Sequence, residues 1–283
     1  MGTRKKTHKK KVIVFDLDET IGHFEEFGRF IDGLASFHEN GWFVKSYKRN
    51  AFDNITEICF DKLLDLYPEF FRHGIFSIFK NLIKEKRKNK HLKIMIYTNN
   101  MGPRSWTLYI KKYIEKKLKH KIFDDIITGF HTNKTKCRTT YKKTHEDLIN
   151  CTKLSKKTPT LFLDDQFHPH MKHTNIKYIQ VHPYKTAIKF SDMTSRFLKE
   201  KEKFGKHFEF VSTISDEEFT TTMGEILSKL GSNSISYTVK KTHISKKDKK
   251  ELQRMIKSIK HFIKKGTRKK YKKSNKSRKL RKS

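Results

Sequence analysis

Apolar residues along the chain form two patterns, short continuous runs and longer segments in which they recur every three or four positions. Short runs rich in β-branched residues are typical of strands buried on both faces, and the recurring pattern is typical of helices with one buried side. The runs span 11–15, 92–97, 126–127, 160–163 and 177–181, and the helical pattern covers about 57–90, 104–120, 143–153 and the region after about 195. Strand and helix alternate, so the sequence predicts an α/β fold with a mostly parallel sheet.

Residues 21–56 fit neither pattern. Four glycines alternate there with Phe and Trp residues, including Trp42 and Phe43. Since glycine favours turns, we expect a flap of turns and short strands that extends, as an insertion after the first strand, over residues 21–70.

The charge is concentrated at the two ends of the chain. The net charge is +35, and residues 240–283 carry 21 Lys or Arg against two acidic residues, while residues 1–11 carry six Lys or Arg. Such blocks often meet nucleic acid or another polyanion. We therefore divide the chain into a basic tail (1–11), a core (12–200), a helical continuation of the core (201–231) and a basic extension (232–283).

The basic extension carries an apolar stripe at helical spacing, Leu252, Met255, Ile256, Ile259 and Phe262. The stripe could pack on the body of the protein, contact a membrane or accompany nucleic-acid binding, and the sequence does not separate these three. From Gly266 onward we expect disorder.

Cysteine content and hydropathy place limits on the class of protein. Cys59, Cys137 and Cys151 are too few and too scattered for a disulfide framework, so we expect reduced thiols. There is no apolar run of about 18 residues and no signal-peptide pattern at the start, which favours a soluble, intracellular protein. The Lys/Arg-rich end resembles a nuclear localisation signal and leaves a nuclear location open.

Polar clusters stand at the ends of three predicted strands. Asp16 and Asp18 follow the first strand, Thr98 follows the second, and Asp164 and Asp165 follow the fourth. In parallel sheets ligands bind at the carboxyl ends of the strands. Paired carboxylates there suit a hard cation such as Mg²⁺, and one of them could attack phosphorus while another protonates the leaving oxygen.

Two further groups lie between or beside these clusters. Lys142 and Lys143 precede the fourth strand, and either could neutralise phosphoryl charge, while the hydroxyl and nearby amides of Thr98 suit phosphoryl oxygens. Three histidines between 168 and 173 suggest zinc, but their spacing matches no established zinc pattern and we favour Mg²⁺.

These segments resemble the four motifs of the haloacid dehalogenase (HAD) superfamily over residues 11–185. The matching segments are Phe15-Asp-Leu-Asp-Glu-Thr20, Tyr97-Thr-Asn-Asn100, Lys142-Lys143 and Leu163-Asp-Asp165. The first is most similar to the NLI-interacting-factor-like group, the small CTD phosphatases. Residues 71–79 resemble the segment that precedes that group's second strand, and Tyr141-Lys-Lys143 resembles its Tyr-Val-Lys motif, which favours Lys143 over Lys142. The second and fourth motifs depart from that group, with Thr-Asn-Asn for Thr-Ala-Ser and Asp-Asp for Asp-Asn.

The resemblance implies a Rossmann-like HAD core and a role for each motif residue. Asp16 would be the nucleophile and a Mg²⁺ ligand, and Asp18 the general acid/base and a ligand through its carbonyl. Thr98, Asn99 and Lys143 would bind the phosphoryl group, and Asp164 and Asp165 would complete the metal site. The implied function is a Mg²⁺-dependent phosphatase acting on a phosphoprotein. A nucleotide or polynucleotide-end phosphatase, and a HAD scaffold that binds nucleic acid through the basic tail, are the alternatives.

Overall fold

The computed structural model describes residues 10–40, 56–129, 137–208, 213–230 and 245–265. Within them lies one five-stranded sheet in the order β3-β2-β1-β4-β5, and every neighbouring pair is parallel. The strands are β1 (Lys11–Phe15), β2 (Leu92–Tyr97), β3 (Asp125–Ile127), β4 (Thr160–Asp164) and β5 (Ile176–Gln180). Each matches a predicted strand to within one residue. The predicted α/β class and parallel sheet are confirmed, and the arrangement is compatible with a Rossmann-like fold.

The helices of the described residues confirm most of the helical pattern. They are α1 (Glu25–Asn40), α2 (Glu57–Asp65), α3 (Ile75–Lys88), α4 (Arg104–Leu118), α5 (His145–Thr152), α6 (Phe190–Lys199), α8 (Asp216–Lys229) and α9 (Lys246–Lys264), with short 3₁₀ turns η2 (Pro68–Phe70), η3 (Pro169–Met171) and η4 (Lys201–Lys203). Several begin at a hydroxyl residue whose oxygen accepts a backbone N–H of the first turn, as Thr56, Thr144, Ser215 and Ser245 do.

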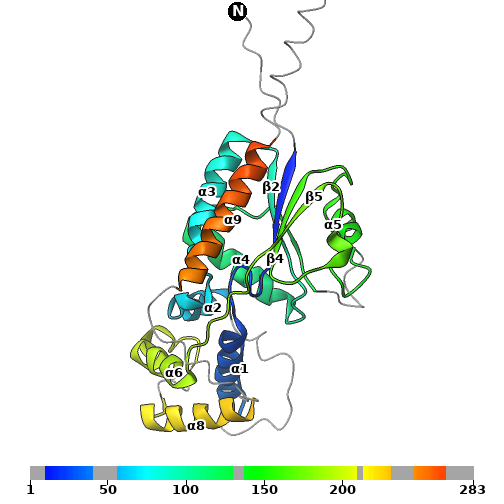
Figure 1. Ribbon diagram of the computed structural model, residues 1–283. Helices are drawn as coiled ribbons and strands as arrows, with labels where there is room; N and C mark the ends of the chain where they lie inside the picture. Colours follow the sequence, from blue (N-terminus) through cyan, green and yellow to red (C-terminus); the bar gives the residue numbers. More distant parts are fainter. Residues whose placement is uncertain (1–9, 41–55, 130–136, 209–212, 231–244, 266–283) are drawn as a thin grey trace, which may run out of the picture.

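The central strand β1 is buried on both faces because apolar side chains point in both directions. Ile13 and Phe15 enter the larger core, which includes side chains of α3, α4 and α9, whereas Val12 and Val14 enter a smaller core under α5. Figure 1 shows α3 and α9 on one side of the sheet and α5 on the other. α1 follows the carboxyl end of β1 and packs with α6 and α8 beyond that edge of the sheet.

The predicted flap of turns and short strands is wrong for residues 25–40, which form α1. The glycines that suggested turns lie inside the helix and let neighbours approach. Gly33 faces Met223, whose Cε would lie 2.7 Å from an added Cβ, and Gly28 faces Trp106. The apolar residues Phe27, Phe30, Ile31 and Leu34 have helical spacing and are fully buried. Within the same predicted insertion, residues 57–65 form α2 and residues 68–70 form η2, as the helical pattern from about 57 indicated. Residues 41–55 of the predicted flap, with Trp42 and Phe43, lie outside the described residues.

Asp32 of α1 is half-buried, and burial raises its pKa to about 6. Because the folded-state pKa exceeds the unfolded value, ionisation of Asp32 favours unfolding, and stability is lost as the pH rises from about 4 through about 6. Asp32→Asn should therefore raise the free energy of unfolding at pH 7.5 by about 1–2 kcal/mol, with little effect near pH 4. Urea unfolding of both proteins at the two pH values measures this. An equal effect at both would show that Asp32 is not the titrating group.

Helix α9 packs its apolar stripe against the body of the protein. Met255, Ile259 and Phe262 are buried in the larger core, and Leu252 lies against Gly74 at the start of α3. Of the three alternatives for the stripe, the structure shows packing on the core. Gly74 has a φ of 77°, which favours glycine, and an added Cβ would lie 2.4 Å from Leu252.

The buried side chain of Lys11, at the start of β1, holds the end of α9. Its Nζ donates to the carbonyl oxygens of Phe262, Ile263 and Lys265 at 2.8, 2.6 and 2.7 Å. The last carbonyls of a helix have no partner within the helix, so a lysine in this position satisfies them and complements the helix dipole.

Lys11→Met should release the end of α9 while preserving most of the apolar packing of the lysine chain. We expect a loss of about 2–3 kcal/mol in the free energy of unfolding, since three charge-assisted hydrogen bonds disappear and three carbonyls lose their donor. Hydrogen exchange of the amides in 255–265 should speed up selectively. The control is Lys10→Met at the exposed neighbouring position, and equal effects of both variants would refute the capping role.

Among the described residues, no helix combines the length and apolar character needed to cross a membrane. The predicted linker after Gly231 and the predicted disorder from Gly266 onward lie outside the described residues.

Candidate active site

Asp16 is the first residue after β1, and the loop that follows it is held tightly. The Asp16 N–H donates to Leu163 O of β4 at 2.9 Å, which ties the ends of the two strands together. Buried Arg72 donates to the carbonyl oxygens of Glu19 and Thr20, at 2.6 Å each, and to that of His182. Glu19 has a φ of 55°, so Arg72 stabilises a turn that a non-glycine residue rarely adopts.

Lys143 lies between two carboxylates at the carboxyl edge of the sheet. Its Nζ is 2.5 Å from Asp16 Oδ1 and 2.7 Å from Asp164 Oδ2, and all three side chains are buried. The ends of β1 and β4 thus meet the loop before α5 in one charged cluster. Lys142, the other candidate lysine, is exposed, so the geometry places Lys143 in the predicted position.

The electrostatics distinguish the two carboxylates. Burial raises the pKa of Asp16 well above its usual value, although the charge of Lys143 opposes the rise. Burial would also raise the pKa of Asp164, but hydrogen bonds from His168 and Lys143 and the lysine charge outweigh it and lower that pKa. Burial would lower the pKa of Lys143, but Asp16 and Asp164 raise it. Lys143 therefore stays charged, and Asp16 is the more easily protonated carboxylate.

Asp164 and Asp165 supply two more carboxylates at the end of β4. Gln166 N–H donates to Asp164 Oδ1 at 2.9 Å, and His168 Nε2 lies 3.4 Å from the same oxygen. Asp165 Oδ1 accepts from Thr20 Oγ1 at 3.2 Å, and the Asp165 N–H donates back to that hydroxyl oxygen. Burial raises the pKa of Asp165, and the charge of Asp164 adds to the rise.

The carboxylates of Asp16, Asp164 and Asp165 could hold a metal ion. One oxygen from each lies within 4.8 Å of the others, and all three residues are buried. An all-oxygen set of this kind fits a hard cation such as Mg²⁺. The carboxylate of Asp18 is outside this group, and ligation by its carbonyl stays a prediction.

Asp18 is tied to the loop after β2. Its Oδ2 accepts from Asn100 Nδ2 at 3.0 Å, and Asn100 N–H donates to Thr98 Oγ1 at 2.9 Å. Burial raises the pKa of Asp18, although the hydrogen bond from Asn100 opposes the rise. The structure thus links the predicted residues Asp18 and Thr98 through Asn100. Because the Thr98 hydroxyl accepts this bond, its proton can still be donated to another oxygen.

Arg138 is a buried residue of the site that sequence reasoning missed. Its guanidinium donates to the backbone carbonyls of Thr98, Thr128, Tyr141 and Lys142 and to the side-chain oxygen of Asn99, at 2.8–3.2 Å. It therefore holds the loops after β2 and β3 against the loop that carries Lys143. Asn99, predicted to bind substrate, accepts a hydrogen bond from Arg138 through Oδ1, and substrate binding by Asn99 stays a prediction.

The expectation of reduced thiols is wrong for two of the three cysteines. Cys137 and Cys151 form a disulfide with a Cα–Cα distance of 4.8 Å, whereas Cys59 is free and buried. The two are close because the loop before α5 folds back onto the end of that helix. The two cysteines are 14 residues apart in the sequence, and no sequence pattern indicates that they are close in space.

The three histidines of the predicted zinc alternative have different surroundings. His168 faces Asp164, whereas His173 stacks on His145 with ring centroids 4.1 Å apart. Among the described residues, the group that could hold a metal is the Asp16, Asp164 and Asp165 cluster. A zinc site of the three histidines finds no support.

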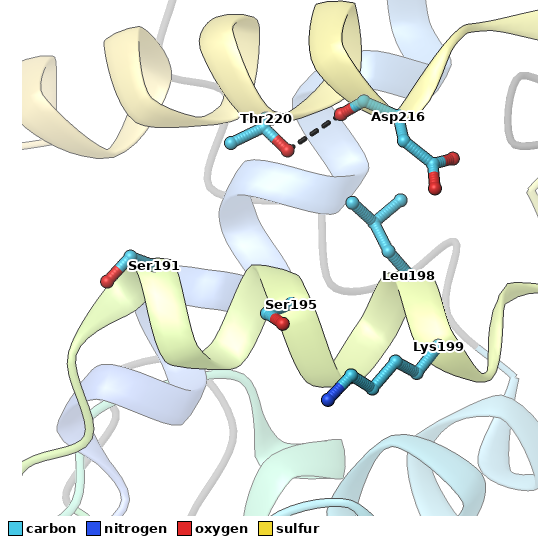
Figure 2. Close-up of a pocket in the computed structure, with 6 residues that line it drawn as sticks. All are labelled: Ser191, Ser195, Leu198, Lys199, Asp216 and Thr220. Carbon is cyan, nitrogen blue, oxygen red and sulfur yellow. Dashed lines mark hydrogen bonds between the residues drawn. The ribbon is translucent and has the colours of Figure 1, made fainter.

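A surface pocket lies apart from this cluster, between α6 and α8. Its lining residues are Ser191, Ser195, Leu198, Lys199, Asp216 and Thr220, and Thr220 Oγ1 donates to Asp216 O at 2.7 Å (Figure 2). Lys201 also binds the Asp216 carboxylate, at 2.6 Å. None of the predicted site residues lines the pocket, so we assign it no role in the site.

A comparison with protein-family models gave no match, and a search of curated proteins gave no significant match. The candidate site therefore stands on its own geometry.

Proposed function

We propose that the chain is a Mg²⁺-dependent phosphohydrolase of the HAD type, with Asp16 as the nucleophile. The observation that carries the proposal is the buried bridge from Lys143 to Asp16 and Asp164. It joins residues 127 and 21 positions apart in the chain at the edge of a parallel sheet where ligands bind. The charge pattern of one ammonium among three carboxylates suits a cation and a phosphoryl group together.

The residues of the site support a two-step reaction. In the first step an Asp16 oxygen bonds to phosphorus as the ester oxygen leaves with a proton from Asp18, which burial keeps easier to protonate than usual. In the second step Asp18 takes a proton from water, whose oxygen attacks phosphorus, releases phosphate and restores Asp16. Thr98 and Lys143 would hold phosphoryl oxygens. A Mg²⁺ ion held by Asp16, Asp164 and Asp165 would supply positive charge that keeps Asp16 ionised and offsets phosphoryl charge.

A phosphoprotein is the substrate class that the resemblance to the CTD phosphatases favours. A nucleotide or polynucleotide end is the second candidate, and the exposed cations of α9 favour it. A scaffold without activity is the third, and the clustering of three carboxylates with a buried lysine argues against it, because such a cluster is costly to bury without a use.

Hydrolysis of p-nitrophenyl phosphate by the purified full chain tests the chemistry. We expect turnover with Mg²⁺ and its loss on chelation, restored by added Mg²⁺. Phosphoserine peptides and oligonucleotides with a 5′- or 3′-phosphate, compared at one salt concentration, then separate the substrate classes. A chain that hydrolyses none of these substrates with any divalent cation would contradict the proposal.

A further inference from the structure

The position of α9 leaves one face of a cationic helix fixed and open to solvent. Its apolar face is covered by the core, and its two ends are held, by Leu252 against Gly74 and by Lys11 on the last carbonyls. Arg254 adds a contact from Nη2 to Gln180 O of β5 at 2.5 Å. The outward face therefore belongs to the folded body and keeps one orientation relative to the sheet.

Exposed cations dominate this outward face. They are Lys246, Lys247, Lys249, Lys250, Arg254, Lys257, Lys260, Lys264 and Lys265. The two acidic residues of the helix are already engaged. Glu251 is buried and pairs with Arg254, and Asp248 bonds with Ser245 at the N-terminus. Little negative charge on the helix is left to offset the row.

Lys11 contacts described residues next to two other basic stretches of the sequence. Its N–H donates to His91 O at 3.2 Å, directly after the cationic end of α3 and Lys90, while its Nζ reaches Lys265 O. Residues 84–90 carry five Lys or Arg, residues 1–10 five and residues 265–283 eleven. Lys11 and Lys265 are far apart in the sequence, but the structure places them in contact. Figure 1 shows α3 and α9 next to each other at this end of the sheet.

The outward face of α9 is better suited to nucleic acid than to an anionic membrane. An amphipathic helix that binds membranes inserts its apolar face, and here that face is buried in the core. The helix of 19 residues is about 28 Å long, so its row of charges can follow several phosphates of a nucleic-acid backbone. Lysine outnumbers arginine in the row, which suits contact with phosphates and not the bidentate reading of bases.

We propose that the outward face of α9, together with the cationic end of α3, is a nucleic-acid-binding surface that contacts the phosphate backbone without reading sequence. We call it the α9 surface. The proposal does not depend on phosphatase activity, since it rests on charge and on the fixed orientation of the helix.

The test is the binding of fluorescein-labelled oligonucleotides to the full chain, followed by anisotropy between 50 and 300 mM salt. The variant replaces four exposed lysines of α9 by glutamine, which preserves helix propensity. These are Lys249, Lys250, Lys257 and Lys260. The matched control replaces four exposed lysines after α5 and in the loop before β5, Lys153, Lys156, Lys157 and Lys172. Both variants lose the same charge.

We expect the α9 variant to bind at least tenfold more weakly at 100 mM salt, and the slope of log K against log salt to become shallower by about 2–4, with little dependence on sequence. The control variant should change affinity less than threefold. Circular dichroism and urea unfolding show whether each variant is folded. Equal losses in both variants would overturn the proposal. So would phosphatidylserine vesicles that bind more tightly than oligonucleotides and depend on the same four lysines.

Discussion

Asp16→Asn is expected to reduce phosphate-ester hydrolysis by at least about 10³-fold, or about 4 kcal/mol in the activation free energy, because asparagine cannot accept the phosphoryl group. The fold should survive. Burial already disfavours the charge of Asp16, as its raised pKa shows, so a neutral isostere removes a desolvation cost while it weakens the contact with Lys143. Turnover of p-nitrophenyl phosphate at saturating Mg²⁺ is the measurement.

Two controls make this result specific. Asp192→Asn removes an exposed carboxylate from α6, far along the chain from the cluster, and should leave turnover unchanged. Asp18→Asn retains the nucleophile and removes the proton donor, so a poor leaving group should be affected more than p-nitrophenolate, which leaves without a proton. If Asp16→Asn retained activity within tenfold of the original chain, Asp16 would not be the nucleophile.

Lys143→Met should impair both stability and activity. The Lys143 ammonium is buried between Asp16 and Asp164, so its removal leaves two buried carboxylates facing each other. Loss of one partner from a buried ionic cluster costs about 3–5 kcal/mol. Turnover should fall by about 10²–10³-fold, since the group that would offset phosphoryl charge is gone. Urea unfolding and p-nitrophenyl phosphate turnover measure the two effects.

Stabilisation of the Lys143→Met variant by divalent cations is a second measurement of the same prediction. A cation bound to Asp16, Asp164 and Asp165 would replace part of the missing positive charge, so Mg²⁺ should stabilise Lys143→Met more than the original chain. Lys142→Met is the matched control, because Lys142 is the exposed neighbour and should affect neither property. The same Mg²⁺ stabilisation in all three proteins would argue against a shared cluster.

The strands could be predicted to within one residue because runs such as Val12–Phe15 are apolar at every position, which a central parallel strand requires. Helix α1 could not be predicted in this way, because its glycines, Gly28 and Gly33, are residues that favour turns. A larger side chain would not fit at position 33, because Met223 of α8 fills the space beside Gly33. This contact joins segments that are far apart in the chain. Tertiary packing overrode the local preference of glycine.

The carboxylates of the site were predictable because they stand at the ends of β1 and β4, and parallel strands end at one edge. Lys143 follows no strand directly, and only the motif resemblance favours it. Arg138 and Asn100 were not predictable, because neither stands at a position that marks chemistry. Arg138 acts on backbone carbonyls, which leave no trace in the sequence, and its buried neighbour Asp147 lies on α5. Asn100 stood inside a recognised motif, but only the fold shows that it reaches Asp18.

The contact between Lys11 and the end of α9 has a consequence for how the chain could be rearranged. β1 begins where α9 ends, so a short Gly/Ser linker from residue 265 to residue 10 would join neighbouring points. Opening the chain between α8 and α9 would then give a circular permutant in which α9 comes first, followed directly by β1. Since Lys11, Gly74 and the core hold α9, such a permutant should still fold, with its most basic helix made first.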